Sequence, residues 1–232
     1  MALPFFYQPE IIAAPSFLLN EETSKHCVQV LRMKEGEQLQ LTDGKGNGYK
    51  AFIAKSDKRH CEVSVIESTF QSPQTRQISI GISLLKNANR FEWFLEKATE
   101  MGIAEIIPLL CQRTERQHFR FDRMQHILIA AMLQSQQVWL PVLHEPTNVR
   151  DLIQSATQRQ KLIAHCEDGD KQNISNLAAA NSVQIIIGPE GDFTNDEINL
   201  ALQNGYQATS LGNTRLRTET AGVVAAALLV NT

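Results

Sequence analysis

Apolar and polar positions alternate over short runs up to about residue 72. Leu39 and Leu41 alternate with polar residues, and a glycine-rich segment at 43–48 separates this run from the next one. Two alternating runs joined by glycines are typical of a β-hairpin. Val63 and Val65 continue the alternation and predict a further strand with one face more buried than the other.

One stretch of this region has helical spacing instead. Between Asn20 and Leu31 the apolar residues predict a short helix with Val28 and Leu31 on its inner side, and Arg32 lies just past its end. Together with the strands, this helix predicts a small β-rich domain of barrel type over residues 1–72.

Beyond a linker at residues 71–75, strand-like runs alternate with helix-like runs. Strands are predicted at residues 78–84, 106–109, 162–164 and 183–187, with a last one running to Leu211; helices are predicted around residues 91–101, 124–135, 149–156 and 194–205, with a last one from about Thr220. Thr194 and Glu197 form a capping box, and Gly102 and Gly205 follow the ends of two predicted helices. Residues 73–232 are therefore predicted to be an α/β domain with a parallel sheet.

Two loops follow predicted strands at the edge where ligands of parallel sheets collect. The first, at residues 187–193, contains Gly188 and Gly191, whose backbone can approach a ligand closely. A tight strand-to-helix turn would explain the same glycines. Neither this loop nor the next has the glycine fingerprint of a dinucleotide site or the sequence of a P-loop, which argues against NAD- and ATP-dependent classes.

The second loop, at residues 211–221, carries Arg215 and Arg217 ahead of a helix. The start of a helix would explain its threonines as capping residues. It would also explain Glu219, because a negative charge is favourable in the first turn of a helix. That interpretation leaves the two arginines unexplained, so the loop is a candidate functional site.

Composition narrows the classes further. The 232 residues carry a formal net charge of −3, which excludes a bulk polycation but allows a local basic face for nucleic acid. Residues 113–123 are a candidate face, and a solvated loop leading into a helix is the alternative. The four cysteines lie far apart, which suggests reduced thiols in a cytosolic protein and no structural zinc site. Neither a membrane span nor a signal peptide is expected.

Several motifs occur together in a recognisable order. They are Gly-Pro-Glu-Gly at 188–191, Leu-Gly at 211–212, Leu-Arg-Thr-Glu-Thr-Ala at 216–221, and the segments at 26–32 and 96–102. In this combination the chain resembles the ribosomal RNA small-subunit methyltransferase E family, which belongs to the SPOUT class.

The resemblance implies an N-terminal PUA-like β-barrel that binds RNA and a C-terminal SPOUT α/β domain with a deep trefoil knot. It implies transfer of a methyl group from S-adenosylmethionine to N3 of one uridine in the 16S rRNA of the small ribosomal subunit, by a homodimer. The cysteine pattern adds the expectation of a cytoplasmic protein without a metal. The residue pattern by itself would favour an open sheet, because threaded loops are rare in proteins.

Carried over residue by residue, the resemblance implies sites for both the cofactor and the RNA. Cofactor contacts fall on Gly188, Pro189, Glu190, Gly191, Leu211, Gly212, Leu216 and Arg217. RNA contacts fall on Arg32 and Lys86, to which the basic segment adds Arg113 and Arg116.

The chemistry of uridine N3 adds two candidate catalytic residues. The N3 proton must leave before or during methyl transfer, so Arg217 is expected to stabilise the uridine anion. Glu219 is the candidate proton acceptor, with Glu190 as a second one. Glu219 could alternatively hold Arg215 or Arg217 in place.

The sequence also departs from the usual family pattern. Asp192 stands where a second glycine is frequent, and Leu133 and Gln137 replace a carboxylate and a guanidinium. These departures bear on RNA binding more than on the cofactor loops. The alternative function, from another class, is an RNA-binding ribosome-assembly protein with a vestigial cofactor pocket.

Overall fold

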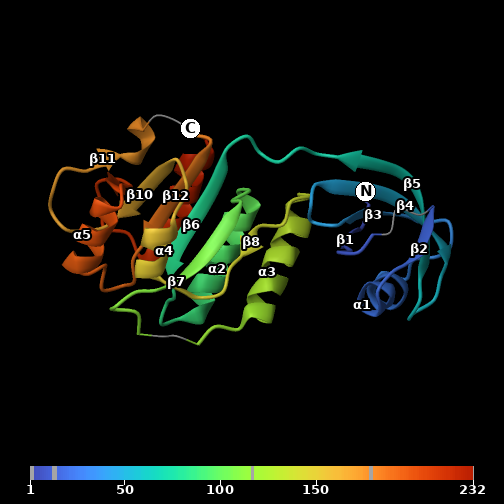
Figure 1. Cartoon of the computed structure of the whole chain (residues 1–232). Helices are drawn as coiled ribbons and strands as arrows, with labels where there is room; N and C mark the ends of the chain where they lie inside the picture. The colour runs from blue at the N-terminus through green and yellow to red at the C-terminus, as the bar shows by residue number, and fades with distance from the viewer. Residues whose placement is uncertain (1–2, 12–14, 116–117, 178–179, 232) are drawn as a thin grey trace. The chain divides into compact units, whose positions relative to one another are not determined.

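The computed structural model describes residues 3–11, 15–115, 118–177 and 180–231 (Figure 1). The chain forms two compact units, each with a sheet of its own. The first unit is Met1–Pro73 together with Met132–Leu140, and the second is Gln74–Ala131 together with Pro141–Thr232. We call them the N-terminal and C-terminal units.

A five-stranded sheet in the order β1-β3-β4-β5-β2 forms the N-terminal unit. Its strands are β1 (Phe5–Tyr7), β2 (Ser16–Leu18), β3 (Gln38–Thr42), β4 (Asn47–Lys55) and β5 (Glu62–Phe70). The predicted hairpin is the antiparallel pair β3–β4, whose turn is closed by Asp43 Oδ1 accepting hydrogen bonds from the amides of Lys45 (2.8 Å) and Asn47 (3.2 Å). Strands β1 and β2 were not predicted, because three residues are too few to display an alternation.

The predicted helix of this unit is present in two parts, α1 (Glu21–Lys25) and a π-helical turn, η1 (His26–Val30). Val28 packs against the core as expected. The expectation that Leu31 faces inward is wrong, because Leu31 is 44% exposed whereas Cys27 is fully buried. A π-helical turn has a wider repeat than an α-helix, and this difference moves the buried face away from the positions that α-helical spacing selects.

The C-terminal unit is built on an eight-stranded sheet in which every described pairing is parallel. Along the order β11-β13-β10-β12-β6-β7-β8, with β9 also on β7, the strands are β11 (Gln172–Asn173), β13 (Gln207–Ser210), β10 (Gln160–Ala164), β12 (Ser182–Ile187), β6 (Gln77–Ser83), β7 (Glu105–Leu110), β8 (Val142–Leu143) and β9 (Thr147–Asn148). The predicted parallel α/β sheet is confirmed. The two-residue strands β8, β9 and β11 were not predicted.

Helices pack on both faces of this sheet. They are α2 (Ala88–Glu100), α3 (Phe121–Gln134), α4 (Val149–Ser155), α5 (Asn195–Gln203) and α6 (Thr218–Val230), with a short 3₁₀ turn, η2 (Ile174–Asn176). The last strand ends at Ser210 and α6 begins at Thr218, slightly before the predicted Leu211 and Thr220.

Two neighbouring positions of β6 identify which helices cover which face. A Cβ atom at Gly81 would lie 3.0 Å from the Leu152 side chain of α4. A Cβ atom at Gly222 of α6 would lie 2.6 Å from the Phe94 ring of α2 and 2.9 Å from Ile82. Successive strand residues point to opposite faces, so α4 covers one face and α2 with α6 covers the other.

Candidate functional site

Three neighbouring strands end together at the carboxyl edge of the C-terminal sheet. Ala164 of β10 is in register with Ile187 of β12 and with Thr209 of β13. The loops that follow these strands therefore emerge side by side, as ligand-binding loops of parallel sheets do. They surround a cavity of about 640 Å³, lined by residues 164–166, 171, 187–190, 192, 209–218 and 221. We call it the strand-end cavity.

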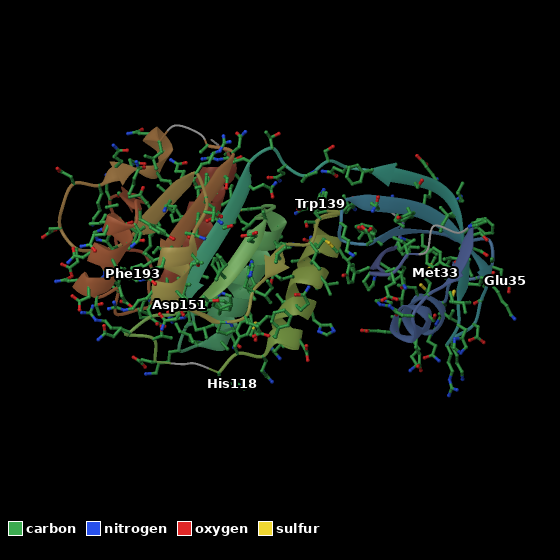
Figure 2. The ribbon with its side chains drawn as sticks, viewed as in Figure 1. Met33, Glu35, His118, Trp139, Asp151 and Phe193 are labelled. Atoms are coloured by element: carbon green, nitrogen blue, oxygen red, sulfur yellow. The ribbon has the colours of Figure 1, made fainter. Side chains whose placement is uncertain are left out.

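The loop after β12 is held at several points. A Cβ atom at Gly188 would lie 3.0 Å from the backbone nitrogen of Phe193, so this turn is built for a residue without a side chain. Phe193 itself is fully buried and fixes the far end of the loop (Figure 2). Arg113 donates hydrogen bonds from Nη1 to the carbonyl oxygens of Gly191 (2.6 Å) and Phe193 (3.3 Å).

Asp192 explains how this loop tolerates the missing second glycine. Its backbone φ is +63°, a region that aspartate enters more readily than most residues. The carboxylate also accepts hydrogen bonds from two backbone amides, at Phe193 (2.8 Å) and at Cys166 in the loop after β10 (2.7 Å). Asp192 therefore joins two of the loops that surround the cavity.

The loop after β13 has its own turn. Gly212 has φ +142°, and its amide lies 3.3 Å from Ser210 Oγ, which in turn donates to the Gly212 carbonyl at 2.9 Å. At the end of this loop Thr218 Oγ1 donates a hydrogen bond of 3.0 Å to the carbonyl oxygen of Gly188. The start of α6 is thereby joined to the turn after β12, with Arg217 immediately before the helix.

All eight predicted cofactor residues lie in these two loops. Seven of them line the strand-end cavity, and Gly191 lies in the same turn beside Arg113. The structure thus brings together two segments that are about twenty residues apart in the sequence.

The predicted catalytic residues Arg217 and Glu219 have different surroundings. Arg217 is exposed and lines the cavity. The side chain of Glu219 is only 8% exposed, and its Oε1 lies 3.6 Å from Arg90 Nε of α2. Its Oε2 is buried without a hydrogen-bond partner among the described residues. Glu219 is therefore turned toward Arg90, a residue that the sequence did not single out.

A second hollow of about 700 Å³ lies in the same unit, and most of the residues that line it have charged or amide side chains. It is lined by Lys86, Asn87, Ala88, Asn89, Arg90, Glu92, Glu115, Arg120, Arg123 and Glu190. We call it the polar hollow. Glu190 lines both this hollow and the strand-end cavity, so the two spaces adjoin.

The predicted RNA-binding residues lie in different places. Lys86 lines the polar hollow, where its Nζ lies 2.9 Å from Glu115 Oε2, and this hydrogen bond raises the pKa of Lys86. Arg113 contacts the loop after β12 instead of lining that hollow. Arg32 is exposed in the N-terminal unit, with φ +55°. Arg116 lies outside the described residues.

The structure also brings His165 to the cavity wall. In the sequence this histidine is conspicuous only as the neighbour of a cysteine, a pair without the spacing of a zinc site. Its position directly after β10, at the carboxyl end of a parallel strand, was the available signal.

Metal ligands and membrane spans are both absent from the described part of the chain. Among those residues, no group of three or more histidine, cysteine, aspartate or glutamate side chains is placed to hold a metal ion. No described helix is long and apolar enough to cross a membrane.

Comparison with known proteins gives one family-model match for each of the two units. Residues 71–230 match the family model of the RNA methyltransferase domain, and residues 19–66 match that of the RNA methyltransferase PUA domain. The chain is 29% identical to ribosomal RNA small subunit methyltransferase E of Synechocystis over 98% of its own length and 77% of that protein. It is 27% identical to the protein of the same name in Bacillus subtilis, over 93% and 90%.

Solved structures are similar along nearly the whole chain. A probable rRNA methyltransferase of Porphyromonas gingivalis is 36% identical with a TM-score of 0.90, covering 97% of this chain and 96% of that one. Ribosomal RNA small subunit methyltransferase E of Neisseria gonorrhoeae, bound to S-adenosylmethionine, is 27% identical with a TM-score of 0.88, again over 97% and 96%. The two domain matches occur in the order of the two units, and they agree with the single cavity built by two loops and with these similar structures. The chain therefore belongs to the RNA methyltransferase family, with a PUA-like domain at its N-terminus.

Proposed function

We propose that this protein transfers a methyl group from S-adenosylmethionine to N3 of a uridine in the 16S rRNA of the small ribosomal subunit. The observation that carries the proposal is the strand-end cavity, which lies within the RNA methyltransferase match. The names of the relatives support the ribosomal RNA substrate, and the cofactor bound in a similar structure supports S-adenosylmethionine.

The residues around the cavity fit this cofactor. The space at Gly188 that a Cβ atom would fill lets the backbone form the wall, and about 640 Å³ is within the range of small-molecule sites. Side chains of both signs line it, which suits the carboxylate and the ammonium of the methionine end. Gly188–Gly191, Leu211, Gly212, Leu216 and Arg217 would hold the cofactor, which supplies a methyl group activated on a sulfonium sulfur.

The chain's own residues must deal with the N3 proton and the negative charge that it leaves. Arg217 lines the cavity with an exposed guanidinium, and we assign it to stabilisation of the uridine anion. Glu190 lines both the cavity and the polar hollow, so its carboxylate can reach an acceptor base placed between them. This position favours Glu190 as the proton acceptor and gives Glu219 the role of positioning Arg90.

The polar hollow is the best place for the acceptor nucleotide. It adjoins the cavity at Glu190. Four of its lining residues carry positive charge against three carboxylates, and the cations are Lys86, Arg90, Arg120 and Arg123. Cations of this kind bind RNA phosphates. The PUA match supports a second RNA contact in the N-terminal unit, where Arg32 is exposed.

The proposal includes a trefoil knot in the C-terminal unit and assembly into a homodimer. The path of the chain after β13 supports a knot. In the sheet, β13 lies on the far side of β10 from β12, whereas the next helix, α6, packs against β6 and β12. Between β13 and α6 the chain must therefore pass back across the loops that follow β10 and β12. Support for a homodimer is α6, an almost wholly apolar helix with half-exposed valines at 223 and 224. The proposal also includes a closed barrel, a boundary between residues 72 and 73 at the predicted linker, and a cytoplasmic location.

Primer extension across 16S rRNA tests the function, because a methyl group on N3 blocks Watson–Crick pairing. RNA from cells that lack the protein should lose one stop at a uridine. The gene should restore this stop in full, and a Gly212→Val copy should restore less of it. Calorimetry with S-adenosylmethionine tests the alternative. An RNA-binding assembly protein with a vestigial pocket would bind the cofactor weakly or not at all and would leave the stop unchanged.

A further inference from the structure

Among the described residues that line the strand-end cavity, His165 is the one with two buried side-chain nitrogens that lack a hydrogen-bond partner. Neither Nδ1 nor Nε2 is accessible to water, and neither has a hydrogen-bond partner in the described part of the chain. Buried polar groups are normally paired, and each unpaired one costs about 1 to 3 kcal/mol. Such a ring in a cavity wall needs a role.

The backbone around His165 is fixed, so the missing partners are not a sign of a loose loop. The amide of Cys166 donates to Asp192 Oδ2 at 2.7 Å, and Lys171 Nζ donates to the carbonyl oxygen of His165 at 2.9 Å. Both contacts hold the main chain and leave the imidazole to be satisfied by something else.

The surroundings of His165 favour the neutral form of its ring. Burial lowers the pKa of His165, and the positive charge of Lys171 lowers it further, while Asp192 and Glu167 act in the opposite direction. A neutral imidazole offers one donor and one acceptor. A half-turn about its Cβ–Cγ bond exchanges each nitrogen with a ring carbon, so the nitrogens can find new partners without movement of the backbone.

These properties select one half of the proposed cofactor. In the methionine half, the carboxylate only accepts hydrogen bonds and the ammonium only donates them. Charged side chains in the cavity can pair with both groups: Lys171, Arg215 and Arg217 with the carboxylate, and Glu190 and Asp192 with the ammonium. The adenine and the ribose are uncharged and offer donors and acceptors together. We propose that His165 recognises the nucleoside half of S-adenosylmethionine through a hydrogen bond from its imidazole ring. This inference rests on the proposed function.

Calorimetry on the full-length chain tests it with two probes, S-adenosylmethionine and 5′-methylthioadenosine, which lacks the amino-acid half. His165→Phe keeps a ring and removes the hydrogen bond, and it should weaken both ligands by about the same factor, near tenfold. His144→Phe is the matched control, because His144 is also half-buried with an unpartnered Nε2 but lies after β8, away from the cavity. It should leave both affinities unchanged. Weaker binding of S-adenosylmethionine alone, or of neither ligand, would overturn the inference.

A measurement on the unchanged protein avoids any effect of substitution on folding. With ¹⁵N-labelled histidine, addition of 5′-methylthioadenosine should shift one ring nitrogen of His165 and leave those of His144 in place. Unshifted His165 nitrogens in a protein that binds the ligand would overturn this inference while leaving the function intact. Failure of the unchanged protein to bind S-adenosylmethionine would overturn the proposed function instead.

Discussion

The proposed function assigns Arg217 to stabilisation of the uridine anion. It lies directly before α6 and lines the strand-end cavity. Arg217→Ala should lower the single-turnover methylation rate by about a hundredfold, the scale of losing one preorganised donor. Arg217→Lys should recover only part of the rate, because it keeps the charge and loses the planar guanidinium. A near-parental rate with saturating cofactor and RNA would remove Arg217 from the chemistry.

Glu219 and Arg90 form a pair whose role can be separated from catalysis. Because Glu219 is buried and Arg90 is 39% exposed on its side chain, Arg90→Ala should leave a carboxylate unpaired and lower the free energy of unfolding by about 1 to 3 kcal/mol. Adding Glu219→Gln should return part of that loss, since a neutral amide is easier to bury. Denaturant unfolding measures both effects.

The same substitution decides whether Glu219 is the proton acceptor. A positioning role predicts that Glu219→Gln alone keeps the methylation rate within about tenfold of the parent, because an amide of the same size leaves a polar oxygen facing Arg90. Loss of nearly all activity at neutral pH, in a variant that remains folded, would instead restore Glu219 to the chemical step and displace Glu190.

At this scale the sequence predicts residue types better than their partners. Gly188, Gly212 and Arg217 are identifiable in their loops from the sequence alone, because glycines and arginines between a strand and a helix are conspicuous. The contact of Arg113 with the loop after β12 and the pairing of Glu219 with Arg90 join residues 78 and 129 positions apart. No local pattern carries that information.

Among the elements, the turn after β13 depends on backbone conformation and not on crowding. Gly212 has φ +142°, and a Cβ atom there would meet nothing within 4 Å. Gly212→Val should therefore strain the loop, leave the core intact and weaken S-adenosylmethionine binding by about tenfold or more. Gly169→Val is a matched control, with φ +151° and equally open surroundings outside the cavity. Equal affinities of the two variants would show that the turn does not shape the site.

Elements with strong local signals were predicted, and those without them were not. Thr194 and Glu197 form both hydrogen bonds of the capping box, and Gly102 and Gly205 have positive φ at the helix ends they were expected to close. The π-helical turn η1 has no such signal, because its sequence reads as ordinary helix. Its wider repeat is why Leu31 was placed on the wrong side.

For the whole molecule, chain order is an incomplete guide to which residues form a unit. Met132–Leu140 groups with the N-terminal unit although it lies far beyond residue 72. Trp139 carries much of this association: its Nε1 donates a hydrogen bond of 2.9 Å to the carbonyl oxygen of Gln71, and its ring meets Phe70 edge to face (Figure 2). Hydrophobic periodicity describes the helix in which this segment begins, but it does not indicate which sheet the segment joins.

Binding of RNA by the whole molecule can be tested through Arg32, which lies in the PUA match. Its φ of +55° is a conformation that asparagine adopts more readily than most residues, so asparagine removes the charge without adding backbone strain. If Arg32 contacts a phosphate, Arg32→Asn should reduce the slope of log K against log salt by roughly 0.7 to 0.9 for a 16S rRNA fragment. Cofactor affinity should not change. Arg59→Asn removes the same charge from another exposed position of this unit and should leave the slope nearly unaltered. Equal slopes for the two variants would mean that only net charge matters and that Arg32 makes no contact of its own.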